Sequence, residues 1–188
     1  RRAQILEATR DVALARGLAH LRVADVATHL GISSGRVHYH FSSKELLYGA
    51  VVRRTFERLG AALTQAMLVG DSFAARFDAV VTTYADFLAH HPELARILVW
   101  ELLDGQGPGG ALLLEQVVPI LDLVERFARI EGRREIREGL PIRAAILQIA
   151  SDLVLRASAR EFKTALWGDQ DHAQALARAL FFSSSGEP

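Results

Sequence analysis

The sequence predicts an all-α protein with three short N-terminal helices followed by a longer helical body. Proline is sparse, with 5 residues in 188, whereas alanine and leucine are abundant. Apolar residues recur at intervals of three and four, which is the period of an amphipathic helix, and no segment shows the alternation of a half-buried strand. Half of the residues are hydrophobic and 23% are charged, so the chain can bury a core. We place the N-terminal domain at residues 1–45 and the body at residues 46–188.

The first two predicted helices each have one apolar face. Residues 2–16 form the first, which Gly17 should end. Residues 23–30 form the second, because apolar residues lie at i, i+3, i+4 and i+7. Gly31 follows it directly, and a glycine at this position predicts a sharp, left-handed turn. The two apolar faces consist of Ile5, Ala8, Val12 and Ala15, and of Val23, Val26, Ala27 and Leu30.

The next two helices have serines at their starts. Ser33 is the expected N-cap of the third helix, which points Val37 and Phe41 inward. Ser42 is the expected N-cap of the fourth, with Glu45 reaching back in a capping box. The fourth helix should run over residues 44–69.

The body continues as helices separated by proline, glycine and charged segments. A stripe of Phe and Val from Phe73 to Leu88 predicts a helix that the His91-Pro92 step ends. Pro119 should kink or split the helix at 111–130, and a charged connection follows it. The remaining predicted helices are 92–104, 141–159 (reaching 167 at most) and 171–182.

Charge is distributed unevenly although the formal net charge is zero. Residues 1–58 hold 10 Lys and Arg against 5 Asp and Glu, and the remainder holds 12 against 17. A basic end on a mildly acidic body indicates an anionic partner for that end, unless surface charge has clustered by chance. The chain contains no cysteine, no signal peptide and no run of 18 apolar residues, so we expect a cytoplasmic protein without a membrane partner. The first residue is Arg1, so we expect the natural start to precede it.

Three motifs suggest enzymes or cofactors but lack the context that such sites need. Gly31-x-Ser33-x-Gly35 resembles a nucleophile elbow, which requires a preceding strand, whereas a helix precedes it here. His38 and His40 are two residues apart and do not share a helix face, which argues against a metal site. The dinucleotide-like Gly105-x-Gly107-x-x-Gly110 also follows a helix. We therefore expect no catalytic residue, no metal and no cofactor.

The segment 23–47 has the features of a helix-turn-helix, whose second helix enters the major groove of DNA. Ser33, Ser34 and Gly35 permit close approach, and Arg36 can donate to the O6 and N7 atoms of guanine. The start of the fourth helix offers free backbone N–H groups to a phosphate. Tyr39, His40 and Lys44 offer further donors to phosphates.

The stretch "VADVATHLGISSGRVHYHFSSKELL" at 23–47 resembles the DNA-binding signature of the tetracycline-repressor (TetR) family of bacterial transcription regulators. The preceding "ILEATRDVALARG" resembles that family's first helix. Three positions depart from the family pattern: Arg22 replaces a capping Ser or Thr, Arg36 a small residue, and His38 a Tyr or Phe. Arg22 and His38 therefore join the candidate DNA contacts, and the operator preference cannot be transferred.

The resemblance implies a homodimer on a partly palindromic double-stranded DNA operator, with an inducer pocket in the body. We expect a repressor that a small, mostly hydrophobic effector releases. Two other classes stay open: an enzyme built on the helical body, and a helical adaptor that binds only protein. The expected pocket residues are Leu63, Met67, Tyr84, Phe87, Trp100, Leu121 and Phe127.

Two apolar stripes suggest how the dimer forms. One lies on the helix at 141–160 and the other on the helix at 171–182, and pairing them with a second copy gives a four-helix bundle. The stripes are Ile142, Ile146, Ile149, Leu153 and Ala157, and Leu176, Ala179, Leu180 and Phe182.

Overall fold

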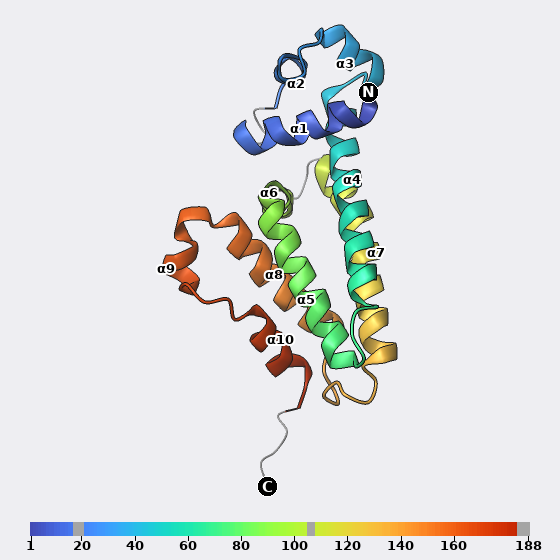
Figure 1. Ribbon diagram of the computed structural model, residues 1–188, viewed down its shortest axis with the longest axis vertical. Coiled ribbons are helices and arrows are strands. Elements are labelled where there is room, and N and C mark those ends of the chain that lie inside the picture. Colours follow the sequence, from blue (N-terminus) through green and yellow to red (C-terminus); the bar gives the residue numbers. More distant parts are fainter. Residues whose placement is uncertain (17–20, 105–107, 184–188) are drawn as a thin grey trace.

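The computed structural model describes residues 1–16, 21–104 and 108–183, and within these ranges the chain is helical (Figure 1). A small N-terminal domain sits at one end of an elongated bundle. The elements are α1 (Arg2–Arg16), α2 (Val23–His29), α3 (Ser34–His40), α4 (Lys44–Ala66), α5 (Phe73–His90), α6 (Pro92–Asp104), α7 (Pro108–Glu131), α8 (Ile142–Ser158), the 3₁₀ turn η2 (Arg160–Phe162), α9 (Lys163–Trp167) and α10 (Ala173–Phe181). The described residues hold one isolated bridge, between Ile136 and Phe182. None of the described helices is long and apolar enough to cross a membrane.

Two separate hydrophobic cores explain this shape. The N-terminal core joins α1, α2 and α3 to the first turns of α4, and Val26 and Val37 in it have no exposed surface. Its last member is Val51, and the next residue, Val52, already belongs to the core of the body. Helix α4 is therefore one continuous element that contributes to both cores.

The helix ends follow the sequence signals with some corrections. Ser43, not Ser42, caps α4: Ser43 is extended (φ −141°, ψ 163°) and its hydroxyl accepts the N–H of Leu46. Ser33 is the N-cap residue of α3, but its side chain makes no capping bond. The predicted end of α4 at residue 69 was wrong, since the helix ends at Ala66.

Pro119 does not split α7, which runs unbroken from Pro108 to Glu131. The predicted stop at Gly17 lies outside the described residues.

The core of the body closes around a cluster of phenylalanines at the end remote from the N-terminal domain. Ring centroids in this cluster are 4.8–6.0 Å apart. Such pairs stabilise by about 0.5–1.5 kcal/mol beyond the area that they bury. The ring contacts pack α10 and the residue after it against α5, and α5 against α7. The cluster consists of Phe73, Phe77, Phe127, Phe181 and Phe182.

The stripe predicted to form the dimer face on α8 instead packs within its own chain. Ile142 and Leu153 are buried in the core of the body, and Ile146, Ile149 and Ala157 pack against that core. The outward face of α8 carries Leu147 and Leu155 instead. The spacing of apolar residues correctly predicted a buried face of α8. It could not show which partner buries that face, because α8 also carries apolar residues on its outward face.

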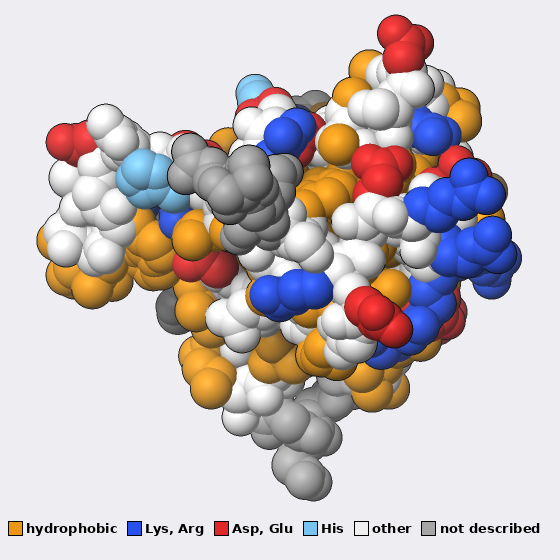
Figure 2. Space-filling model, turned by 90° about the horizontal axis from the view of Figure 1, so that it is seen from below, with side chains coloured by type: hydrophobic (Ala, Val, Ile, Leu, Met, Phe, Trp, Pro, Cys, Tyr) orange, Lys and Arg blue, Asp and Glu red, His pale blue; other side chains and the backbone are white. Residues whose placement is uncertain are grey.

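A short lobe containing η2 and α9 projects from the side of the body (Figure 1). The indole Nε1–H of Trp167 donates to Asp152 of α8 at 2.8 Å, and the Arg156 guanidinium lies 5.9 Å from the indole ring. Hydrophobic side chains gather on this lobe at the left of Figure 2. Phe162 and Leu166, which belong to η2 and α9, are exposed. The lobe is thus tied to α8 from one side and presents apolar side chains on the other.

Candidate nucleic-acid interface and internal cavity

The turn between α2 and α3 is fixed by its backbone. Gly31 adopts φ +63°, a left-handed conformation that costs glycine little. Its N–H donates to the carbonyl of Thr28 at 3.1 Å, and the N–H of Ile32 donates to that of Ala27 at 3.0 Å. These two bonds make a Schellman motif, which ends α2 and sets the direction of α3.

Helix α3 turns a single side chain, Val37, into the N-terminal core. Most of its other side chains face outward, and Tyr39 has 85% of its surface exposed. The predicted contact residues sit on this surface and at the adjoining starts of α2 and α4. Those that are exposed are Arg22, Ser33, Ser34, Gly35, Arg36, His38, Tyr39 and Lys44, whereas His40 is half-buried.

Gly35 is not required by the packing of its own chain. A Cβ atom built there meets only the Ser33 Oγ, at 3.9 Å, which is ordinary contact distance. Its backbone is not in a left-handed conformation either. The absence of a side chain at Gly35 therefore leaves space on the outer face of α3 that a binding partner can approach closely.

Positive charge near α3 is available for a partner. Arg22, Arg36 and Lys44 form no ion pair within the part of the chain that the structure describes. The Arg2 guanidinium lies 5.1 Å from the centroid of the Phe41 ring, which places a further cation beside the end of α3. The sequence prediction omitted Arg2, although the tandem of arginines at the start of the chain was a signal for it.

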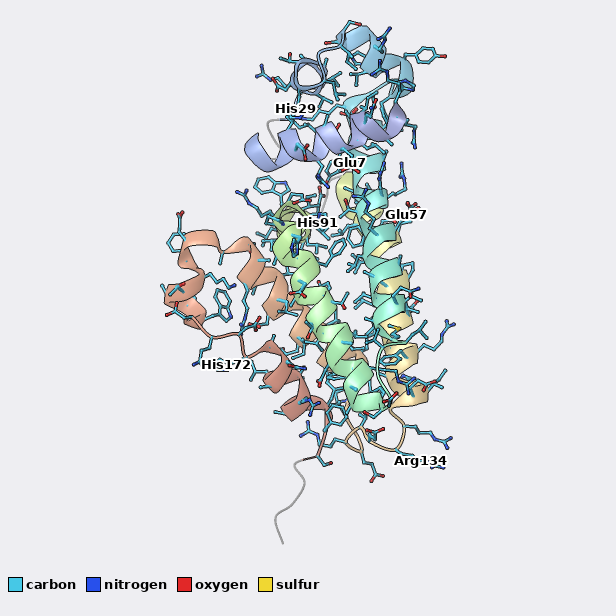
Figure 3. All side chains as sticks on the ribbon, in the orientation of Figure 1. Glu7, His29, Glu57, His91, Arg134 and His172 are labelled. Carbon is cyan, nitrogen blue, oxygen red and sulfur yellow. The ribbon has the colours of Figure 1, made fainter. Side chains whose placement is uncertain are left out.

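Other arginines of the basic N-terminal segment bind Glu7 of α1 (Figure 3). Glu7 lies 2.6 Å from Arg58, 3.0 Å from Arg54 and 3.0 Å from Arg10. Burial acts to raise the pKa of Glu7, but the hydrogen bond and charge of Arg58, with the other two arginines, lower it overall. This cluster joins α1 to α4, so it fixes the N-terminal domain on the helix that enters the body.

An apolar cavity of about 370 Å³ lies inside the body among α4, α5, α6, α7 and α8, and Phe181 of α10 also lines it. Among the described residues that line it, Tyr84 and Ser151 are polar and none carries a charged side chain. Burial raises the pKa of the Tyr84 phenol, which therefore remains a neutral hydroxyl. Leu102 and Leu103 of α6 and Leu155 of α8 line the cavity and are also exposed, so they mark its opening.

Four of the seven predicted pocket residues line this cavity: Leu63, Tyr84, Leu121 and Phe127. The other three do not. Met67 is buried in the core of the body, Phe87 stacks on His91 with 4.4 Å between ring centroids, and Trp100 is 65% exposed. The prediction missed Ile146, Ile149 and Leu153, whose stripe was assigned to the dimer.

The structure shows the surroundings of two of the three motifs that resembled enzyme or metal sites. Ser33 follows α2 and a turn, with no strand before it. Within the described ranges, no group of three or more His, Cys, Asp or Glu gathers to hold a metal. The glycines of the dinucleotide-like motif lie partly outside the described residues.

The fold and these two sites define a class: a helix-turn-helix domain joined to a helical body that contains an apolar cavity. Residues 5–51 match the model of the family described as "Bacterial regulatory proteins, tetR family". The N-terminal domain therefore matches the DNA-binding domain of the tetR family.

The chain is also similar to particular transcription regulators. The "HTH-type transcriptional activator FasR" of Mycolicibacterium smegmatis is 32% identical over 98 residues, which are 52% of this chain and 45% of FasR. The fatty acid degradation regulator FadR of Bacillus halodurans superposes with a TM-score of 0.77 at 17% identity, over 96% of this chain and 97% of FadR.

FadR of Bacillus subtilis, in complex with stearoyl-CoA, gives a TM-score of 0.74 at 17% identity over 96% and 95% of the chains. The match spans less than half of the length of FasR. The solved structures therefore support the fold, and the family model supports the kinship of the N-terminal domain.

Proposed function

We propose that this protein is a transcription regulator, a ligand-responsive repressor that binds a palindromic operator as a homodimer in the cytoplasm. One observation carries the proposal: α3 presents a small, basic outer face while α4 connects it to an apolar cavity. An enzyme would need converging ionisable groups, and none of the described residues that line the cavity is charged. An adaptor that binds only protein would leave the exposed Arg36 and the free space at Gly35 unexplained.

The N-terminal turn of α3 would enter the major groove of the operator. Arg36 lies exposed there and would donate two hydrogen bonds to a guanine. Lys44 begins the next helix, where a phosphate would receive both its ammonium group and the N-terminal N–H groups of α4. Arg22, His38, Tyr39 and His40 would add phosphate contacts around this centre.

Two substitutions separate base reading from phosphate binding. Arg36→Ala should reduce the free energy of operator binding by about 1–3 kcal/mol per half-site and relax the preference for one base at a single position. Lys44→Ala should weaken binding to all operator variants alike. It should also lower the slope of log affinity against log salt concentration by about one unit per half-site. The measurement is fluorescence anisotropy over single-base operator variants at two salt concentrations. A uniform loss for Arg36→Ala would reassign that residue to a phosphate.

A homodimer would pair the outward faces of α8 and α10. Leu147 and Leu155 on α8 are 41% and 49% exposed, and Leu176 on α10 is 51% exposed. Packing these faces against a two-fold copy would bury them in a four-helix bundle. The same symmetry would set the two α3 helices about 34–36 Å apart, one turn of DNA.

Light scattering tests this arrangement. Leu176→Arg should convert the dimer to a monomer at micromolar concentration, because the new charge has no partner in an apolar interface. Leu166→Arg is the matched control, since Leu166 lies on the projecting α9 and is 69% exposed. A wild-type protein that is monomeric would contradict the proposal.

The effector would be a mostly hydrophobic molecule, because the cavity wall is apolar except for Tyr84 and Ser151. The stearoyl-CoA bound by FadR of Bacillus subtilis makes a fatty acyl thioester a reasonable first probe. The acyl chain would occupy the cavity, and its polar head would remain at the opening beside Leu102 and Leu103. Isothermal titration calorimetry with stearoyl-CoA and with free coenzyme A separates the contribution of the acyl chain to binding from that of the coenzyme A head.

A further inference from the structure

One polar group in the cavity wall has no partner within its own chain. Tyr84 lies on α5 and lines the cavity. Its hydroxyl forms no hydrogen bond with any of the residues that the structure describes, and burial alone raises the pKa of the phenol. The hydroxyl is therefore neutral and shielded from bulk water. Because a shielded donor without a partner is unfavourable, this hydroxyl favours the binding of a molecule that can accept its hydrogen bond.

Tyr84 differs in this respect from the other tyrosines of the chain and from Ser151. Tyr39 is 85% exposed, so water can hydrogen-bond to its hydroxyl. The Tyr48 hydroxyl of α4 donates to the Glu101 Oε1 atom of α6 at 3.1 Å. Ser151, the second polar residue of the described wall, is exposed on α8, so water reaches its hydroxyl as well. The Tyr84 hydroxyl has neither a protein partner among the described residues nor open solvent around it.

The surroundings of Tyr84 restrict the chemistry of its partner. An apolar stripe of α5 from Phe77 to Val81 lines the cavity, and Tyr84 ends this stripe. Phe77 and Tyr84 are separated by about two helical turns, or about 10 Å along the helix axis. None of the described lining residues is charged, so a carboxylate beside Tyr84 would lose its hydration without gaining a counter-charge. A neutral oxygen at the end of an apolar body of this length avoids that penalty.

We infer that Tyr84 selects the effector by donating a hydrogen bond to one neutral oxygen, a carbonyl or a hydroxyl, at the end of an otherwise apolar molecule. The inference rests on the proposed function, because it assigns the chemistry of the molecule that the regulator binds. A hydrocarbon of the same shape leaves the Tyr84 hydroxyl unpaired, and a carboxylate is buried without a counter-charge. Ketones, esters and thioesters belong to the selected class, and the thioester carbonyl of stearoyl-CoA is one example.

The first test needs no effector. Thermal unfolding compares wild type with Tyr84→Phe and Tyr48→Phe, each of which removes one hydroxyl and keeps the ring. Tyr48→Phe should melt about 2–4 °C lower than wild type, because it loses the hydrogen bond to Glu101. Tyr84→Phe should melt at the wild-type temperature or above it, because the hydroxyl that it loses has no partner. A fall as large as that of Tyr48→Phe would overturn the inference, since the Tyr84 hydroxyl would then be satisfied within the chain.

The second test measures selectivity with three probes of one shape. Para-cyclohexylacetophenone carries a ketone at one end, para-cyclohexylethylbenzene has a methylene group in its place, and para-cyclohexylbenzoate has a carboxylate. Affinities follow from the rise in melting temperature with probe concentration. The ratio of ketone affinity to hydrocarbon affinity should fall about fivefold in Tyr84→Phe and stay unchanged in Tyr48→Phe, since Tyr48 is not among the described residues that line the cavity. Wild type should bind the carboxylate at least about tenfold more weakly than the ketone.

The outcomes separate the role of Tyr84 from the proposed function. An affinity ratio that stays the same in Tyr84→Phe, or falls equally in Tyr48→Phe, would overturn the inference. So would a wild type that binds none of the three probes, or that binds the carboxylate as tightly as the ketone. Operator affinity without probe is measured in parallel, and it should be equal for wild type and Tyr84→Phe. Operator binding that persists while selectivity fails would reject only the role of Tyr84. A wild type that binds no operator would reject the proposed function, whatever the probes show.

Discussion

Gly35→Ala should separate DNA binding from folding more sharply than any charge substitution. The added Cβ meets only Ser33 Oγ at 3.9 Å, so it strains nothing within the chain. Replacing a helical glycine by alanine stabilises a helix by up to about 1 kcal/mol, and Gly35 lies near an end, so we expect a gain between zero and that value. If α3 lies in the major groove, the same methyl group is forced against the DNA. Inserting a group into a well-packed site costs about 1–3 kcal/mol, here in binding free energy.

The assay pairs two measurements on one preparation. Chemical unfolding should show equal or higher stability for Gly35→Ala, while anisotropy with operator DNA shows a loss of about 5-fold to 150-fold per half-site. Gly60→Ala is the matched control: Gly60 lies in α4, a Cβ there meets nothing within 4 Å, and it is remote from α3. Wild-type operator affinity in Gly35→Ala would refute the proposed placement of α3 in the groove.

Three further predictions concern the scaffold and the cavity. Glu7 has a folded pKa below its ordinary value of 4.5, so its contribution to stability is present above that pH and is lost as the pH falls through the lower folded value. The difference in melting temperature between wild type and Glu7→Gln should therefore shrink below pH 4.5, and a difference that stays constant down to pH 3 would contradict this. Gly132→Ala should lower stability by about 1–3 kcal/mol in urea unfolding, because the new Cβ comes within 2.7 Å of the Ala128 carbonyl oxygen and also strikes Phe73; stability equal to Gly60→Ala would count against it. Val81→Trp should fill part of the cavity and abolish stearoyl-CoA binding in calorimetry while operator binding persists, and unchanged probe affinity would place the ligand elsewhere.

The helices and the turn could be predicted because their signals are local. Gly31 alone indicates the left-handed turn, and the spacing of Val23, Val26, Ala27 and Leu30 indicates which face of α2 is buried. The capping residue of α4 was misplaced because Ser42 and Ser43 are adjacent and both could cap; the backbone conformation decides between them.

The long-range features could not be read from periodicity. The stripe containing Ile146 and Ile149 looks the same whether it meets its own body or a second copy, and in this fold it lines the cavity. Trp100 lies on an apolar helix, yet it points to solvent because α6 packs through its other face. The Tyr48–Glu101 contact joins residues 53 positions apart, and no local pattern links them.

The most direct test of the central claim is an anisotropy titration of the wild-type protein with labelled duplex DNA from upstream of its own gene, with and without stearoyl-CoA. We predict saturable binding of one dimer at nanomolar concentration, with affinity falling steeply as salt rises, and release of the DNA when stearoyl-CoA is added. Binding no tighter than to a scrambled duplex of the same length and composition would contradict the assignment of this chain as an operator-binding regulator.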